Sequence, residues 1–217
     1  MTQTFKTTEN SVILERHYEV KNFSDRIALI FCKFLRFCAD LFFQKRYGNR
    51  AIILETVAAV PGMVGGMLIH LKCLRKMISD NGWIHTLLDE AENERMHLMA
   101  FAEIIKPRWY ERWAVVLVQG IFFNIFFVLY IFAPRTAHRL VGYFEEEAVI
   151  SYTGYLACID SGEIENIPAP KMAIEYWNLE QDARLRDMVI AIRLDEMNHR
   201  DVNHDFANTL DGKKKKA

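Results

Sequence analysis

Few residues in this chain of 217 break a helix or favour a strand. The chain has only ten glycines and five prolines, and alternating runs of β-branched residues are scarce. This shortage argues against a β-sheet and predicts an all-α fold. The length is sufficient for one domain, residues 1–217, with a full buried core.

Paired cysteines, an excess of positive charge and a signal peptide are also lacking. The four cysteines show no C-x-x-C spacing, so no disulfide is predicted and the thiols are expected in the core or facing lipid. The net charge is −1, so no nucleic-acid partner is predicted. Residues 1–22 contain no apolar signal core and are too acidic for a typical transit peptide, so we interpret them as an N-terminal arm.

What the chain does contain is six helical segments. Apolar periodicity, capping residues and turn signals predict them between the arm and a basic tail. They cover residues 24–46, 50–78, 84–106, 112–133, 134–161 and 172–208, and the tail covers 209–217. Pro61 should kink the second segment. A break in the sixth segment is expected near Leu179–Asp182.

Two of these segments are unusually apolar. Residues 24–46 are apolar around most of the helix, with one polar stripe of Lys33, Arg36 and Asp40. Residues 112–133 contain WAVVLVQGIFFNIFFVLYIFA, which carries no charge and has the length of a membrane span. Both fit helices that lie in the membrane surface. The alternative for the first is a core helix whose cations snorkel to water.

The motif Glu-x-x-His occurs twice, at Glu94–His97 and at Glu196–His199. Residues three apart on an α-helix lie about 60° apart around the axis and about 4.5 Å apart along it, so each pair can face one point. Asp201 and His204 have the same spacing but lie roughly 140° around the helix from the second pair. We expect them to face elsewhere.

Two pairs of this kind provide half of a dinuclear metal site in a four-helix bundle, which needs one more carboxylate from each remaining helix. Glu55 is one candidate, because it stands in an apolar run with no lysine or arginine between Arg50 and Lys72. The other lies within the run 145–147, which is Glu-Glu-Glu, and spacing alone does not choose among the three. Oxygen and imidazole ligands suit iron or manganese. The metal-free alternative treats all these residues as surface charges.

A shared metal site would restrict the topology. Glu94 precedes the charge-free segment and Glu196 follows it, so a single membrane crossing would separate them. Residues on opposite faces of a bilayer cannot share metal ions about 3.5–4 Å apart. The segment should therefore lie in the membrane surface or pack as a buried helix. With residues 24–46 it would form a monotopic membrane face, through which a lipid-soluble substrate enters sideways.

Four stretches occur in an order that is typical of one family: LETVAAVPGMV, NERMHLM, EEEAVISYT and LDEMNHRDVNH. Over residues 24–208 the chain closely resembles the alternative oxidases, the cyanide-resistant ubiquinol oxidases. The resemblance implies a ferritin-like four-helix bundle with a di-iron core and two additional membrane-surface helices, often as a homodimer. It implies a non-proton-pumping terminal oxidase that oxidises ubiquinol and reduces O₂ to water.

The resemblance also implies a role for individual residues. The ligands of two non-haem iron ions (Fe²⁺/Fe³⁺) would be Glu55, Glu94, His97, Glu145, Glu196 and His199. Tyr152, seven residues after Glu145 and on the same helix face, matches the redox tyrosine. Residues that orient ligands and relay protons would be Asn93, Asp195, Tyr176 and His138. Quinol-binding positions would be Arg26, Arg50, Leu54, Glu147 and Ala148.

The resemblance leaves location and some alternatives open. The long N-terminal extension of plant members, with its regulatory cysteine, is not in this sequence. The short start favours the cytoplasmic side of a bacterial inner membrane, with the matrix side of the mitochondrial inner membrane as the other interpretation. The main rival function is a membrane-bound di-iron hydroxylase that acts on a quinone ring. Iron storage and a non-catalytic membrane scaffold are further alternatives.

Overall fold

The computed structural model describes residues 18–43, 46–106 and 108–214. The regular structure of this part of the chain is α-helical, and an isolated β-bridge joins Pro168 to Arg184. The helices are α2 (Phe23–Phe43), α3 (Tyr47–Lys76), α4 (Trp83–Ile104), α5 (Trp109–Phe132), α6 (Pro134–Asp160), α7 (Lys171–Trp177) and α8 (Leu185–Lys214). The all-α prediction is confirmed.

Helices occupy all six predicted segments, and the last segment contains two of them. Asn178 ends α7 in the left-handed conformation with φ 49°, a common way to stop a helix. The chain resumes as α8 at Leu185, so the interruption covers the predicted break. Helix α8 then continues through Asp211 into the segment expected to be a basic tail.

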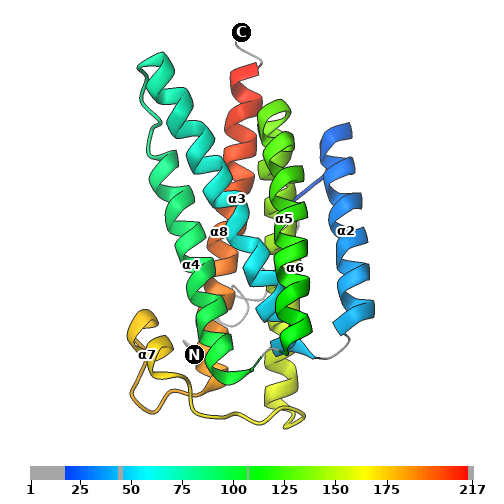
Figure 1. Cartoon of the computed structure of the whole chain (residues 1–217), viewed down its shortest axis with the longest axis vertical. Coiled ribbons are helices and arrows are strands. Elements are labelled where there is room, and N and C mark those ends of the chain that lie inside the picture. The colour runs from blue at the N-terminus through cyan, green and yellow to red at the C-terminus, as the bar shows by residue number, and fades with distance from the viewer. Residues whose placement is uncertain (1–17, 44–45, 107, 215–217) are drawn as a thin grey trace, which may run out of the picture.

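Four long helices form the bundle. Helix α3 packs along α4, and α6 packs along α8. Figure 1 shows these helices running side by side, with α5 and α2 on one flank and the short α7 at one end. Buried apolar side chains fill the space between the pairs near one end, among them Phe101 on α4, Leu156 on α6 and Ile192 on α8. Burial of such side chains supplies most of the stability of a helical bundle.

A glycine sets the distance between α3 and α4. A Cβ atom added at Gly62 would lie 2.3 Å from the carbonyl oxygen of Leu87, which is closer than atoms can pack. Helix α3 also continues through Pro61 without interruption. The close approach brings Glu55 on α3 toward the helix that carries Glu94.

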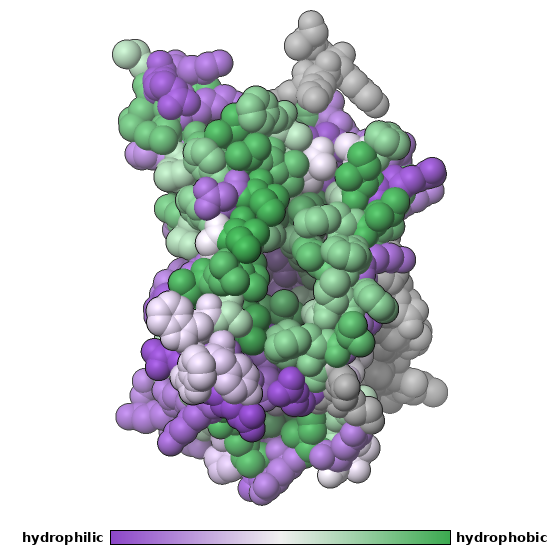
Figure 2. Space-filling model, turned by 45° about the vertical axis from the view of Figure 1, so that its right-hand side comes forward, coloured by the Kyte–Doolittle hydropathy of each residue, from purple (hydrophilic) through white to green (hydrophobic). Residues whose placement is uncertain are grey.

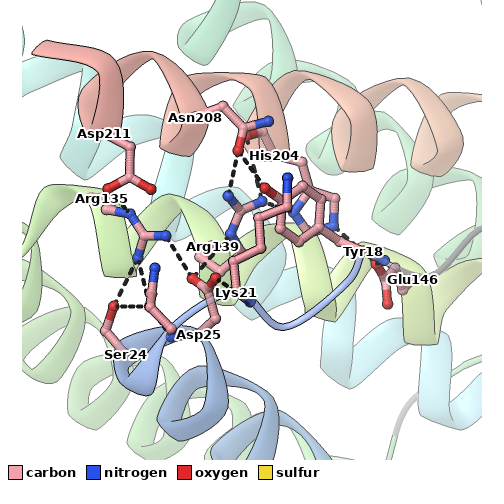
Figure 3. A network of polar contacts seen from close by, with 11 residues as sticks. Tyr18, Lys21, Ser24, Asp25, Arg135, Arg139, Glu146, His204, Asn208 and Asp211 are labelled. Atoms are coloured by element: carbon pink, nitrogen blue, oxygen red, sulfur yellow. Dashed lines mark hydrogen bonds and ion pairs between the residues drawn. The ribbon is translucent and has the colours of Figure 1, made fainter. Parts of the chain in front are cut away.

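Buried ion pairs attach α2 to the bundle (Figure 3). The carboxylate of Asp25 is fully buried and lies 2.9 Å from Arg135 Nη2 and 3.3 Å from Arg139 Nε. Just before α2, the ring of Tyr18 lies 3.5 Å from the guanidinium carbon of Arg139 and stacks on the His204 ring. These contacts fix the start of α2 against α6 and α8.

Many large apolar side chains are exposed on one side of the molecule. Figure 2 shows a continuous hydrophobic area there, with hydrophilic residues above and below it. Its large exposed side chains on α2 include Phe34, Phe37 and Leu41, and those on α5 include Trp113, Leu117 and Ile121. Helices α3 and α5 are each long and apolar enough to cross a membrane. In the most apolar 18-residue stretch of α5 only 11% is buried, compared with 50% in the corresponding stretch of α3.

Candidate metal centre

Six acidic and imidazole side chains meet inside the four-helix bundle. They form two groups of four residues. Within each group, the potential ligand atoms all lie within 4.8 Å of one another. The first group is Glu55, Glu94, His97 and Glu196, and the second is Glu94, Glu145, Glu196 and His199. Glu94 and Glu196 belong to both groups, so the geometry fits two adjacent metal ions that share two carboxylates.

Each bundle helix contributes one carboxylate, and α4 and α8 each add a histidine one turn later. The structure brings together all six residues that the sequence singled out, and of the run 145–147 it places Glu145 in the cluster. Asp201 is exposed, and His204 lies 3.0 Å from Glu146 outside the cluster. The prediction that Asp201 and His204 face away from the cluster is confirmed.

Several polar atoms in the cluster are buried without a well-aligned hydrogen bond, although His199 Nδ1 lies 2.7 Å from Glu94 Oε1. They are Glu55 Oε2, both carboxylate oxygens of Glu94, and Nδ1 of His97 and of His199. An unpaired buried polar atom costs about 1–3 kcal/mol, and more when it is charged. Metal ions bound between these atoms would satisfy all of them. The residues therefore fit a pair of iron or manganese ions, since the donors are carboxylate oxygens and imidazole nitrogens.

The protonation of the cluster also indicates that a cation belongs there. Burial, followed by the charge of Glu94, raises the pKa of Glu55 to about 8 and that of Glu196 to about 8. Burial opposes a charged His199, yet Glu94 raises its pKa to about 9. Without metal the cluster therefore retains protons that are ordinarily lost at neutral pH. Metal binding would displace them.

His97 is held in a defined orientation. Its Nε2 lies 3.2 Å from Asp195 Oδ2, and its Nδ1 faces the carboxylates of Glu55, Glu94 and Glu196 at 3.3–3.5 Å. Although burial opposes the charge, the neighbouring carboxylates raise the pKa of His97 well above its ordinary value. Since Asp195 is an acceptor, Nε2 would keep its proton when a metal binds, and the metal would displace the proton on Nδ1. The hydrogen bonds to Asp195 hold the pKa of its carboxyl below the ordinary value, although burial opposes the shift.

Asp195 is itself held by two donors. Asn93 Nδ2 donates at 3.0 Å and the indole nitrogen of Trp177 at 2.7 Å. Asn93 Nδ2 also lies 3.0 Å from the hydroxyl of Tyr176. Short helix α7 is thus connected to the cluster by two aromatic side chains. Trp177 was not among the predicted site residues, although it stands next to Tyr176.

His138 lies apart from this arrangement. Its Nε2 is 2.8 Å from the hydroxyl of Tyr130, and its Nδ1 is 2.9 Å from Asn203 Oδ1. Burial lowers the pKa of His138 to about 4, so the ring is neutral. The sequence placed His138 among residues that orient ligands, and the structure connects it to His199 only through Asn203, which donates to the His199 carbonyl oxygen.

Tyr152 contacts the cluster directly. Its hydroxyl donates a hydrogen bond to Glu55 Oε1. Burial and the neighbouring charge of Glu55 raise the pKa of Tyr152 well above its ordinary value, so the phenol keeps its proton. The ring also stacks against Phe101. Tyr152 is therefore placed to exchange a proton with a candidate ligand.

A second polar group lies between the apolar helix α2 and the bundle. Arg36 on α2 pairs with Glu147 on α6, and Arg50 on α3 pairs with Asp40 on α2. The Nε of Arg36 also lies 3.4 Å from Asp40. The sequence predictions gave no role to Arg36 or Asp40, although their i, i+4 spacing on a polar stripe was visible.

The remaining residues predicted to bind quinol are distributed unevenly. Leu54 is 40% exposed next to Glu55, and Ala148 packs at the edge of the core that contains Tyr152. Arg26 is exposed near the start of α2. It lies ten residues before Arg36, which is about 15 Å along a helix. The structure therefore links Arg50 to Glu147 through Asp40 and Arg36, and does not bring Arg26 to them.

Comparison with known proteins identifies the family. A family model described as alternative oxidase matches residues 5–208. The chain belongs to the alternative oxidase family. It is 60% identical over 200 residues to ubiquinol oxidase 2, mitochondrial, of Glycine max, which covers 92% of this chain and 60% of the relative. Identity to ubiquinol oxidase 2, mitochondrial, of Arabidopsis thaliana is 60%, over 92% of this chain and 56% of the relative.

The resemblance noted from the four sequence stretches is thus confirmed. A ubiquinol oxidase, mitochondrial, of Mangifera indica is 59% identical over 92% of this chain and 63% of its own length. The chain spans about 60% of the length of these alternative oxidase relatives. All six clustered residues lie inside the region that the family model matches.

Proposed function

We propose that this chain is a ubiquinol:oxygen oxidoreductase, a terminal oxidase of a respiratory chain that pumps no protons. The observation that carries the proposal is the double carboxylate–imidazole cluster with unsatisfied buried atoms, adjacent to an outward apolar face. A soluble metal store needs no such face, and a scaffold needs no such cluster. The curated relatives are named ubiquinol oxidases, which supports the same reaction.

Two iron ions would be held by the six clustered residues. The ligands are Glu55, Glu94, His97, Glu145, Glu196 and His199. When bound, the irons supply the electron transfers and the open coordination positions that reduction of O₂ requires. The charges of four carboxylates balance two divalent ions. The apolar bundle around the cluster excludes bulk water from it.

Tyr152 and Glu55 would handle a proton beside the metals. The phenol donates to Glu55 Oε1, and burial keeps that proton on the phenol. A phenol can release its proton and one electron together. Reduction of O₂ to water takes up four electrons and four protons, and oxidation of each ubiquinol supplies two of each. We assign Tyr152 the role of giving one electron and its proton toward O₂, after which ubiquinol would restore the phenol.

The quinol ring would bind between α2, α3 and α6. Arg36, Asp40, Arg50 and Glu147 provide charged hydrogen-bonding groups there, within an otherwise apolar surface. Leu54 and Ala148 lie on the two bundle helices that carry Glu55 and Tyr152. A quinol whose hydroxyl contacts Arg50 or Glu147 would therefore approach the cluster from the apolar face.

The protein would attach to one leaflet of a membrane. The helices run side by side (Figure 1). A membrane crossed by α5 would therefore also enclose exposed charged side chains of α4 and α8, such as Glu92, Arg95 and Asp201. Immersion of the exposed apolar face of α2 and α5 alone avoids that cost. The relatives are named mitochondrial, which favours the mitochondrial inner membrane, matrix side, over the bacterial membrane that the short start suggested.

The proposed partners also include a second copy of the chain. Helix α3 presents an outward stripe of Met63, Met67, Leu71 and Leu74 at helical spacing. Such an exposed apolar stripe fits the homodimer expected from the resemblance.

The test is oxygen consumption by the purified, iron-loaded protein with a short-chain ubiquinol in the presence of cyanide. We expect steady uptake of O₂, with label from ¹⁸O₂ appearing only in water. Label in the quinone ring would instead indicate the rival di-iron hydroxylase. A Glu94→Ala variant serves as the control, because Glu94 belongs to both ligand groups. Absence of uptake by the iron-loaded wild type would rule out the oxidase proposal.

A further inference from the structure

A fifth buried carboxylate lies beside the metal cluster. Glu90 is on α4, one turn before Glu94, and is 4% exposed. It belongs to neither of the two groups of potential ligands. Burying a carboxylate costs free energy. The mechanism proposed above makes no use of Glu90.

A line of hydrogen bonds ends at Glu90. Asn203 Nδ2 lies 3.0 Å from Oε1 and 2.9 Å from Oε2 of Glu90. The other side of the amide, Oδ1, lies 2.9 Å from His138 Nδ1, so that nitrogen donates. His138 Nε2 is then an acceptor for the hydroxyl of Tyr130 at 2.8 Å. Every donor in this line points toward Glu90, an arrangement that favours an anionic carboxylate at its end.

The line is not a path for protons. An amide such as that of Asn203 does not exchange its protons readily, so it interrupts any transfer between His138 and Glu90. What Asn203 does is connect two parts of the structure. The same Nδ2 that contacts Glu90 also donates to the backbone carbonyl oxygen of His199 at 3.0 Å.

We propose that Glu90 is a positioning residue for the half of the metal centre that contains His199. This inference rests on the proposed function, because it assumes that metal binds there. Through Asn203, Glu90 holds the helical turn of α8 that carries His199. Burial raises the pKa of Glu90 to about 7, while the charge of His199 and the hydrogen bond from Asn203 oppose that shift. An ionised Glu90 would favour a cation bound by His199.

The test compares Glu90→Gln with Glu92→Gln. Glutamine keeps an oxygen that accepts from Asn203 but removes the charge. Glu92 is an exposed carboxylate on the same helix, paired with Arg95, so its variant controls for the loss of one acidic residue. Binding of Co²⁺ to the metal-free protein is measured by chelator competition, together with the cobalt absorption spectrum. We expect one of the two Co²⁺ ions to bind about tenfold more weakly to Glu90→Gln than to the wild type.

A second variant keeps the inference testable if Glu90→Gln does not fold. Asn203→Ala leaves the Glu90 carboxylate in place but removes its connection to His199. We expect weaker binding of the same ion and an altered cobalt spectrum. Two ions bound with wild-type affinity by whichever variant folds would overturn the inference and leave the proposed function intact. A wild-type protein that binds no metal would overturn both.

Discussion

The Nε2 atom of His97 lies 3.2 Å from Oδ2 of Asp195, while Nδ1 of the same ring faces three carboxylates. One contact on the outer side of the ring therefore decides which nitrogen is available to a metal. Asp195 is held in turn by Asn93 and Trp177. This relationship makes the orientation of a candidate ligand depend on residues from α4, α7 and α8.

Replacing Asp195 with asparagine should weaken metal binding. The substitution removes the charge that fixes the His97 tautomer and increases the basicity of its inner nitrogen. We expect a loss of about 10–100-fold in metal affinity, measured by chelator competition. Glu175→Gln, an exposed carboxylate change on α7, is the control. Unchanged affinity in Asp195→Asn would show that this contact does not support a metal ligand.

Replacing Tyr152 with phenylalanine should reduce quinol oxidation by about 100-fold, the scale of a lost proton-transfer group. The metal content should remain that of the wild type, because the cluster keeps all six side chains. The matched control is Tyr155→Phe, a buried tyrosine three residues further along α6. Oxygen uptake with a short-chain quinol provides the measurement. Full activity in the Tyr152 variant would remove the phenol from the mechanism.

The two arginines on α2 should behave differently. Arg36→Gln removes the charged partner of Glu147 and should raise the KM for ubiquinol by about tenfold, as expected for one charged hydrogen bond. Arg26→Gln, on an exposed part of the same helix, should leave the KM unchanged. Steady-state kinetics with both variants separates these expectations. A larger effect at Arg26 would support the assignment made from sequence.

Sequence reasoning located the candidate metal cluster but not all of the contacts around it. The two Glu-x-x-His pairs predicted the cluster because both ligands of a pair lie on one helix, and helical geometry fixes their relation. The contact between Arg36 and Glu147 joins helices more than one hundred residues apart, and no local pattern records it. Glu90 and Asn203 were missed for the same reason, since their burial follows from the packing of α4 against α8.

The ion pairs of Asp25 should contribute strongly to stability. Asp25→Asn would remove the carboxylate that pairs with the fully buried Arg139, while Arg135 would keep its second partner, Asp211, at 2.6 Å. Removal of one partner of a buried ion pair costs about 3–5 kcal/mol. Chemical unfolding in detergent, followed by circular dichroism, measures the change. A loss below about 1 kcal/mol would mean that α2 is held by its apolar contacts instead.

His138 should make the metal-free protein less stable in acid. Burial lowers its pKa from 6.5 to about 4, so between these values the unfolded chain binds more protons than the folded chain. Its contribution is fully present above pH 6.5 and is lost as pH falls toward 4, by about 3 kcal/mol in total. Unfolding free energies measured across this range should fall less steeply in His138→Gln. Equal slopes in both proteins would contradict the assignment.

The central claim is that six side chains from four helices hold two iron ions. The most direct measurement is diffraction from crystals of the iron-loaded protein, recorded at the iron absorption edge. We predict two anomalous peaks about 3.5–4 Å apart, enclosed by Glu55, Glu94, His97, Glu145, Glu196 and His199. A single peak, or iron bound elsewhere in the chain, would contradict the account.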